Sequence, residues 1–186
     1  MPATVIPVKG LYLGFVGSIS NEGYSLRSER QVKPTDTKSI AFGETAVLNT
    51  DNTYSSVAQF IANSGTLTAS IPVGIAVSNV NINPTYNVQG TNGAVTPGGS
   101  YLPGQPCDVL VQGTINVYCA NGTPTAGGSV WIRTVLNGAV PNGVVGGLEA
   151  QADGSNSVLY PNFKWKTGFL EVDGTAQVTI LARQIP

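Results

Sequence analysis

Turn-forming pairs that contain glycine interrupt the chain so often that few stretches are long enough for a regular helix. Asn-Gly or Asp-Gly pairs begin at Asn92, Asn121, Asn137, Asn142, Asp153 and Asp173. Such pairs supply the positive φ angles that tight hairpin turns require. Between the turns lie stretches rich in Val, Ile, Thr and aromatic residues, which are typical of strands: 39–48, 73–80, 108–118, 129–136, 158–165 and 176–182. The pattern predicts an all-β sandwich or barrel.

Three segments depart from the strand pattern. Residues 54–62 are the best candidate for a helix, of one or two turns. Residues 1–17 carry apolar side chains with little charge, and we expect either an extended N-terminal arm or a first strand of the sheet. Residues 81–104 are rich in Pro, Gly, Asn and Thr, which indicates one long loop. The length of 186 residues favours a single domain, with the β-domain over 18–186.

The scarcity of charge excludes several classes of function. The chain has 9 Lys and Arg, 10 Asp and Glu, and no His, for a net charge of −1. A chain this close to neutral offers no electrostatic footprint for nucleic acid. Without His it lacks the usual base near neutral pH and the commonest metal ligand, and two Cys cannot form a four-ligand zinc site. We therefore expect no catalytic residues, no cofactor, no metal and no direct contact with nucleic acid.

Acidic turns and a glycine run resemble binding motifs, but a turn explains each of them. Asp51, Asp153 and Asp173 stand beside Asn or Gly, which favours turn roles over calcium sites or a catalytic carboxylate pair. The GVVGG run at 143–147 lacks the Lys-Ser/Thr ending of a phosphate loop. We expect its glycines to serve a tight turn or a close backbone approach.

The N-terminal sequence does not match a signal peptide or a membrane span. Pro2, Pro7 and Gly10 break its short apolar run, and no run approaches the roughly 20 apolar residues of a spanning helix. We expect synthesis in a cytoplasm and no contact with a membrane.

The two cysteines lie in one β-rich stretch, CDVLVQGTINVYC. Residues of one parity share a face of a strand, which groups Cys107, Val109, Val111, Ile115, Val117 and Cys119. If Gly113 centres a hairpin, the two cysteines would lie opposite each other and a disulfide is conceivable. Two buried free thiols are the favoured alternative.

Basic residues cluster in one part of the sequence, at Arg27, Arg30, Lys33 and Lys38. They form either a solvated strand edge or loop, or a rim that contacts an acidic partner, where charges steer docking more than they add affinity.

Several blocks, taken in order, resemble one known family. They are VGSISNEGYSLRSERQVK at 16–33, IAFGETAVLNTDNTYS at 40–55, VGIAVSNVN at 73–81, YLPGQPCDVLVQGTINV at 101–117, NGTPTAGGSVWIR at 121–133 and GVVGGLEAQADGSNSV at 143–158. Their order and spacing are similar to those of the structural cement (capsid decoration) proteins of tailed bacteriophages. The resemblance implies a jelly-roll-like domain without catalytic residues. It also implies a virion protein on the outer capsid surface that bridges neighbouring major capsid subunits, stiffens the shell against DNA pressure and associates with other copies of itself.

Candidate contact residues follow from the charge and apolar patterns. An extended apolar arm can add a strand to a neighbour's sheet edge, and the charged and aromatic candidates lie elsewhere. The candidates are Val5, Ile6, Val8, Leu11, Tyr12, Leu13, Arg27, Arg30, Lys33, Tyr86 and Tyr101. An alternative function is a carbohydrate- or receptor-binding β-sandwich, in which Tyr86 and Tyr101 would be exposed aromatic residues.

Overall fold

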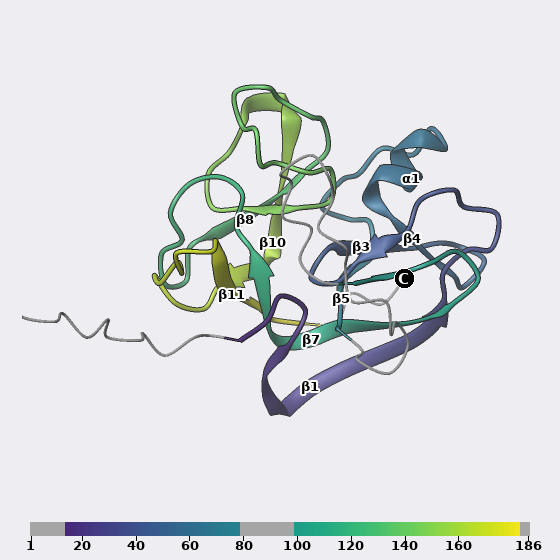
Figure 1. Cartoon of the computed structure of the whole chain (residues 1–186), viewed down its shortest axis with the longest axis horizontal. Helices are drawn as coiled ribbons and strands as arrows, with labels where there is room; N and C mark the ends of the chain where they lie inside the picture. Colours follow the sequence, from purple (N-terminus) through teal and green to yellow (C-terminus); the bar gives the residue numbers. More distant parts are fainter. Residues whose placement is uncertain (1–13, 79–98, 183–186) are drawn as a thin grey trace, which may run out of the picture.

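A curled antiparallel sheet dominates the computed structural model, which describes residues 14–78 and 99–182 (Figure 1). Its strands are β1 (Ile19–Gln31), β3 (Thr45–Leu48), β4 (Tyr54–Ser56), β5 (Val73–Ala76), β7 (Pro106–Tyr118), β8 (Ser129–Arg133), β9 (Leu148–Glu149), β10 (Ser157–Trp165) and β11 (Thr175–Ile180). A small second ladder joins β2 (Ile40–Ala41) to β6 (Ser100–Tyr101). The helical segments are α1 (Val57–Ala62) and the 3-10 turn η1 (Gly154–Asn156).

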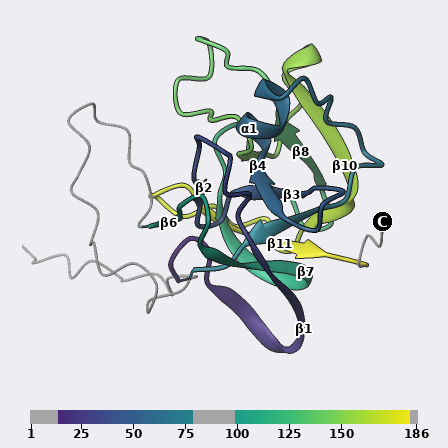
Figure 2. The same ribbon diagram turned by 90° about the vertical axis from the view of Figure 1, so that its right-hand side faces the viewer.

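The sheet has one continuous path of neighbouring strands and one strand outside it. Neighbouring strands follow the path β4-β3-β5-β7-β11-β10-β8-β9, and β1 pairs with β7 outside this path. The sheet curls into a half-barrel, which confirms the expected all-β, jelly-roll-like fold class. Figure 2 shows β1 at the bottom of the molecule and α1 near its top, at the side of β3 and β4.

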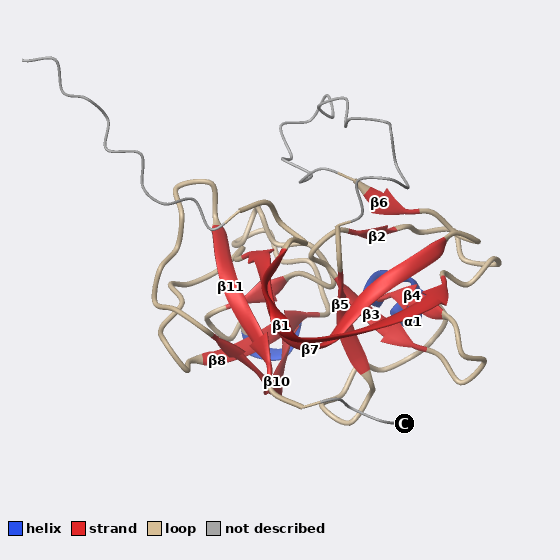
Figure 3. Cartoon of the chain, turned by 90° about the horizontal axis from the view of Figure 1, so that it is seen from below, coloured by secondary structure: helices blue, strands red, loops and turns tan. Residues whose placement is uncertain are grey.

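Strand β7 joins the two halves of the sheet. It pairs with β1 over most of its length, from Gln31 opposite Pro106 to Ile19 opposite Ile115 (Figure 3). Its other edge pairs first with β5 and then with β11, which runs antiparallel to it from Gly113 to Tyr118. One strand thus holds three neighbours in place.

Gly113 does not centre a hairpin, so the hairpin predicted between the two cysteines is wrong. The strand continues through Gly113 at a φ of +125°, where a Cβ would lie 3.0 Å from the Cα of Ser25. The residues that face the main core change parity here, from Leu110 on one side to Ile115 on the other. The ladder with β1 shifts register just before Gly113, where β7 has one extra residue between Leu110 and Gln112, and such a bulge reverses the alternation of faces.

The change of parity sends β7 side chains into two separate cores. The main cluster fills the half-barrel and includes Ile115, Val117 and Cys119 with the large side chains of β8, β10 and β11. The second cluster contains Cys107 and Val109 with Tyr101 and Phe42. The expectation that both cysteines share one face is therefore wrong, whereas the favoured alternative of two buried free thiols is confirmed.

The remaining expected elements are found with shifted bounds. The strand expected at 39–48 is divided into β2 and β3 by a turn at Gly43, whose φ is +75°. The helix expected at 54–62 is half strand and half helix, because the Ser56 side chain accepts a hydrogen bond from the Gln59 amide and begins α1 at Val57. Strand β6 ends the loop expected over 81–104 before its predicted limit, and residues 79–98 lie outside the described part.

Gly74 provides a test of the packing between β5 and β7. A Cβ at this position would lie 2.4 Å from Val109 Cγ1 and 2.6 Å from the Leu110 carbonyl oxygen. The side chain can shift but the backbone carbonyl cannot, so we expect G74A to destabilise the fold by about 1–3 kcal/mol. The melting temperature should fall by about 2–4 °C for each kcal/mol. The control is G138A, whose Cβ meets nothing within 4 Å. Equal melting temperatures for both variants would contradict the close packing.

Candidate functional site

The predicted basic cluster is divided between two places. Arg27 and Arg30 belong to β1, the strand at the lower end of the molecule (Figure 1), whereas Lys33 and Lys38 follow this strand and contact β4 and α1. Arg27 lies in the β1 ladder opposite Leu110, and its Nη1 is 3.5 Å from Asp108 Oδ2. Arg30 donates a hydrogen bond of 3.1 Å from Nε to Ser28 Oγ. Acidic and hydroxyl side chains of this protein thus surround the arginines, and the surface carries mixed charge.

Lys33 and Asp51 form an ion pair at 2.8 Å next to this strand. The hydrogen bond between them raises the pKa of Lys33 and lowers the pKa of Asp51 to about 2. Asp51 also accepts hydrogen bonds from the Thr53 amide and hydroxyl, which is the turn role expected for it.

Strand β1 lies beyond the main strand path of the sheet and pairs with β7 along one of its edges. Among the described strands only β7 pairs with β1. Tyr24 is 86% exposed and Leu26 also lies on the surface. Long exposed edge strands are ready templates for pairing with another chain. We call β1 together with the part of β7 that pairs with it the β1 ribbon.

Several predicted contact residues lie elsewhere. The arm residues and one tyrosine fall outside the described part of the chain: Val5, Ile6, Val8, Leu11, Tyr12, Leu13 and Tyr86. Tyr101 is fully buried, and its hydroxyl donates a 2.6 Å hydrogen bond to the Val77 carbonyl. The expectation that Tyr101 is exposed is therefore wrong. Its ring packs edge-on against Phe42 in the second core.

A second surface lies at the opposite end of the molecule. Residues 134–147 contain no charged side chain, and we call them the uncharged loop. Leu136 is 67% exposed, and Val135 and Val144 are also exposed. This loop follows β8 at the top of the molecule, whereas β1 lies at the bottom, in both Figure 1 and Figure 2.

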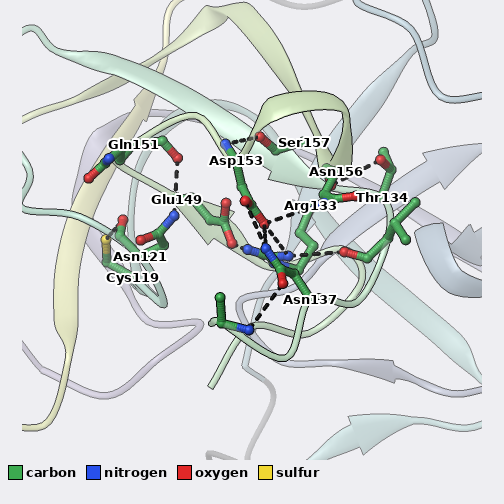
Figure 4. A network of polar contacts seen from close by, with 12 residues as sticks. Cys119, Asn121, Arg133, Thr134, Asn137, Glu149, Gln151, Asp153, Asn156 and Ser157 are labelled. Carbon is green, nitrogen blue, oxygen red and sulfur yellow. Dashed lines mark hydrogen bonds and ion pairs between the residues drawn. The ribbon is translucent and has the colours of Figure 1, made fainter. Parts of the chain in front are cut away.

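A buried arginine supports the uncharged loop (Figure 4). The Arg133 side chain has no exposed area, and its Nε is 2.5 Å from Glu149 Oε1. Its Nη1 lies 2.9 Å from Asp153 Oδ2 and donates a 3.0 Å hydrogen bond to the Val135 carbonyl. Asn137 donates to both oxygens of Asp153 at 2.9 Å. We call these five residues the Arg133 network.

Burial and hydrogen bonding act differently on the two carboxylates of the Arg133 network. Burial raises the pKa of Glu149, and the adjacent Arg133 opposes this shift. The hydrogen bond from Asn137 lowers the pKa of Asp153, with a further contribution from Arg133. Both carboxylates are thus engaged by side chains of the protein itself.

The glycines of the GVVGG run fit closely around polar side chains, as expected. A Cβ at Gly143 would lie 2.5 Å from Arg133 Nε, and a Cβ at Gly146 would lie 2.7 Å from Glu44 Oε1. Glu44 accepts a 2.9 Å hydrogen bond from the Ala41 amide, and burial raises the pKa of Glu44 to about 7. The backbone of this run therefore packs directly against the side chains of Arg133 and Glu44.

Sequence reasoning missed Arg133 and Glu149, although the sequence contains a signal. They are the only charged residues between Asp108 and Asp153, and their charges are opposite. Isolated charges within a β-rich stretch tend to be buried as pairs, because a lone buried charge is costly.

Two general features of the described residues bear on function. No group of three or more His, Cys, Asp or Glu side chains in residues 14–78 and 99–182 is arranged to hold a metal ion. Within the same ranges, no helix has the length and apolar character needed to cross a membrane.

Comparisons with known proteins agree with the fold. The family model described as "Structural cement protein (E217 gp24/Pam3 gp6)" matches residues 8–182. A chain of the solved structure titled "The capsid of Myoviridae Phage XM1" is similar with a TM-score of 0.58 and 12% identity, over 97% of this chain and 98% of that chain. At this identity the likeness shows a shared fold. No curated protein matches the sequence.

Proposed function

Because this chain belongs to the phage structural cement protein family and has a capsid-stabilising role, we propose that it acts from the outer capsid surface and joins neighbouring major capsid subunits. The observation that carries the proposal is the placement of two candidate contact surfaces, the β1 ribbon and the uncharged loop, at opposite ends of one packed fold (Figure 1). A protein that joins two neighbours needs two separate surfaces.

Avidity explains how such a protein can stabilise a shell with modest contacts. Each copy that is held at one end presents its other end at high local concentration, so the second contact forms without a new diffusional step. A packed β-fold also loses little conformational freedom on binding, which reduces the cost of ordering.

The β1 ribbon suits a contact with the major capsid protein. Its arginines and acidic residues form a mixed-charge rim, which directs encounter and orientation. Among the described strands only β7 pairs with β1, and we propose that the opposite edge of β1 accepts an extended segment by strand addition. We propose that Arg27, Arg30 and Lys33 contribute to this interface.

The uncharged loop suits a contact with a second copy of this chain. In a two-fold symmetric interface each patch meets the same patch on the other subunit. A charge near the axis would then face a like charge, which costs free energy, whereas Val135, Leu136 and Val144 can pack against their own copies. The protein is proposed to associate with itself through this loop.

We also propose that the chain is a virion protein without catalytic activity that is made in the host cytoplasm. The one group of neighbouring carboxylates discussed above, Glu149 and Asp153, is bound to Arg133 and Asn137. Glu149 has no exposed area for a substrate to reach.

The capsid role is tested on shells prepared with and without this protein. Shells that lack it should rupture at a lower temperature and release DNA more readily, because fewer contacts join neighbouring subunits. Calorimetry and a DNA-release assay measure both effects, and a density map of complete particles locates the chain. Unchanged shell stability, or a location inside the shell, would contradict the proposal.

The charged rim is tested by the double variant R27E/R30E. We expect its association rate with cement-free shells to fall about tenfold at low salt, with a weaker dependence on ionic strength, because the rim steers encounter. Surface plasmon resonance on immobilised shells measures both quantities. The control K164E/K166E changes the net charge equally, from residues in and next to β10. Equal rates for the two variants would show that the arginines do not steer docking.

We propose that the N-terminal arm adds contacts to a neighbouring subunit. Phe15 is exposed where the described chain begins, next to the start of β1. Deletion of residues 1–10 should leave a folded protein that dissociates from shells faster, because the arm no longer adds its contacts to a neighbour. Circular dichroism checks the fold and shell binding checks the contact. A truncated protein that cannot fold would place the segment in the domain's own sheet.

A further inference from the structure

Arg133 contacts the uncharged loop near its beginning, in its middle and at its end. Its Nη1 donates a hydrogen bond to the Val135 carbonyl, and its guanidinium fills the space beside Gly143. Its backbone carbonyl accepts a 2.9 Å hydrogen bond from the Gly146 amide, and its amide donates to the Gly147 carbonyl at 3.0 Å. One residue thus fixes both ends of the loop relative to β8.

Asn137 connects the network to the part of the loop that carries Leu136. Its Nδ2 donates to both oxygens of Asp153, and its Oδ1 accepts a 3.0 Å hydrogen bond from the Ala139 amide. Its backbone carbonyl accepts a further bond of 2.9 Å from the Val140 amide. Asn137 therefore joins the loop's first turn to a side chain that Arg133 already holds (Figure 4).

Stability alone does not account for this arrangement. Desolvation of two charges can cost more than their attraction returns, and apolar side chains of similar volume often stabilise a fold as well or better. Arg133 Nη2 and Glu149 Oε2 are buried and find no hydrogen-bond partner among the described residues. The hydrogen bonds of Arg133 and Asn137 are directional and tie named atoms of the loop to the network, so they favour one conformation of the loop.

We infer that Arg133 is a positioning residue for the uncharged loop, which it holds through Asp153 and Asn137 so that Val135, Leu136 and Val144 meet a second copy of this chain already in place. This inference rests on the proposed self-contact of the loop. A loop held in its bound conformation loses less freedom on association, so the bound state should persist longer.

The test removes one link between the network and the loop, the Asn137 side chain, and leaves the direct contacts of Arg133 and its buried ion pair in place. Replacing Arg133 would leave Glu149 buried without its partner, and such a variant is expected to unfold. N137A leaves the ion pair in place and removes only the bonds to Asp153 and Ala139. The matched control is Q151A, which truncates an exposed amide near the same network.

Hydrogen exchange and shell binding measure the two steps of the inference. In N137A, the amides of residues 139, 140 and 142–145 should exchange at least tenfold faster at an almost unchanged melting temperature. Dissociation from fully occupied shells should be about tenfold faster. At low occupancy, where neighbouring sites are empty, dissociation should match that of the unmodified protein. Q151A should behave as the unmodified protein throughout.

A third variant, L136D, separates the inference from the proposed function. It leaves the network intact and places a charge in the proposed self-contact. If L136D speeds dissociation at full occupancy but N137A does not, the positioning role is overturned and the contact stands. If L136D has no effect, the loop is not a contact between copies, and the inference falls with it. Unchanged exchange in N137A would also overturn the positioning role.

Discussion

The pairing of β7 with three strands is the constraint on which the rest of the structure depends. β1 occupies one edge of β7, while β5 and β11 share the other, so that both halves of the sheet are hydrogen-bonded to one strand. The parity change at Gly113 lets this strand supply side chains to two cores. The β1 ribbon is held directly by β7, and the uncharged loop is held through β11, β10 and β8. Both proposed contact surfaces therefore rest on this pairing.

Local sequence predicts those strands whose own side chains are apolar and buried in the core. β7, β8, β10 and β11 are rich in β-branched and aromatic residues, and each was expected within a few positions of its bounds. β1 was missed because its sequence is dominated by Ser, Glu and Arg, and its order comes from the partner strand. Tyr101 was assigned to a loop because its local sequence gives no sign of the contacts that bury it. Its burial depends on Phe42 and Val77, which are distant in sequence.

The residues of the candidate site were harder to predict from sequence than the strands. Family resemblance led to the correct role, but it carried no information about Arg133 and Glu149, whose contact depends on the pairing of β8 with β9.

The Asn-Gly and Asp-Gly pairs show that one sequence pattern can serve different structural roles. Gly122, Gly154 and Gly174 take the expected positive φ, but Gly138 and Gly143 do not. Gly143 is instead needed because the Arg133 side chain leaves no room for a Cβ.

Burial of Arg133 reconciles two requirements that conflict at the proposed self-contact. Directional bonds favour one shape of a loop without regular secondary structure, and the strongest of these bonds involve charged groups. In a two-fold symmetric contact, an exposed charge near the axis would face its own copy. With Arg133 and Glu149 both without exposed area, their charges cancel inside the protein. Asp153 is covered by the Asn137 amide and is only 18% exposed. The network thus gives the loop its conformation while Val135, Leu136 and Val144 determine what a partner meets.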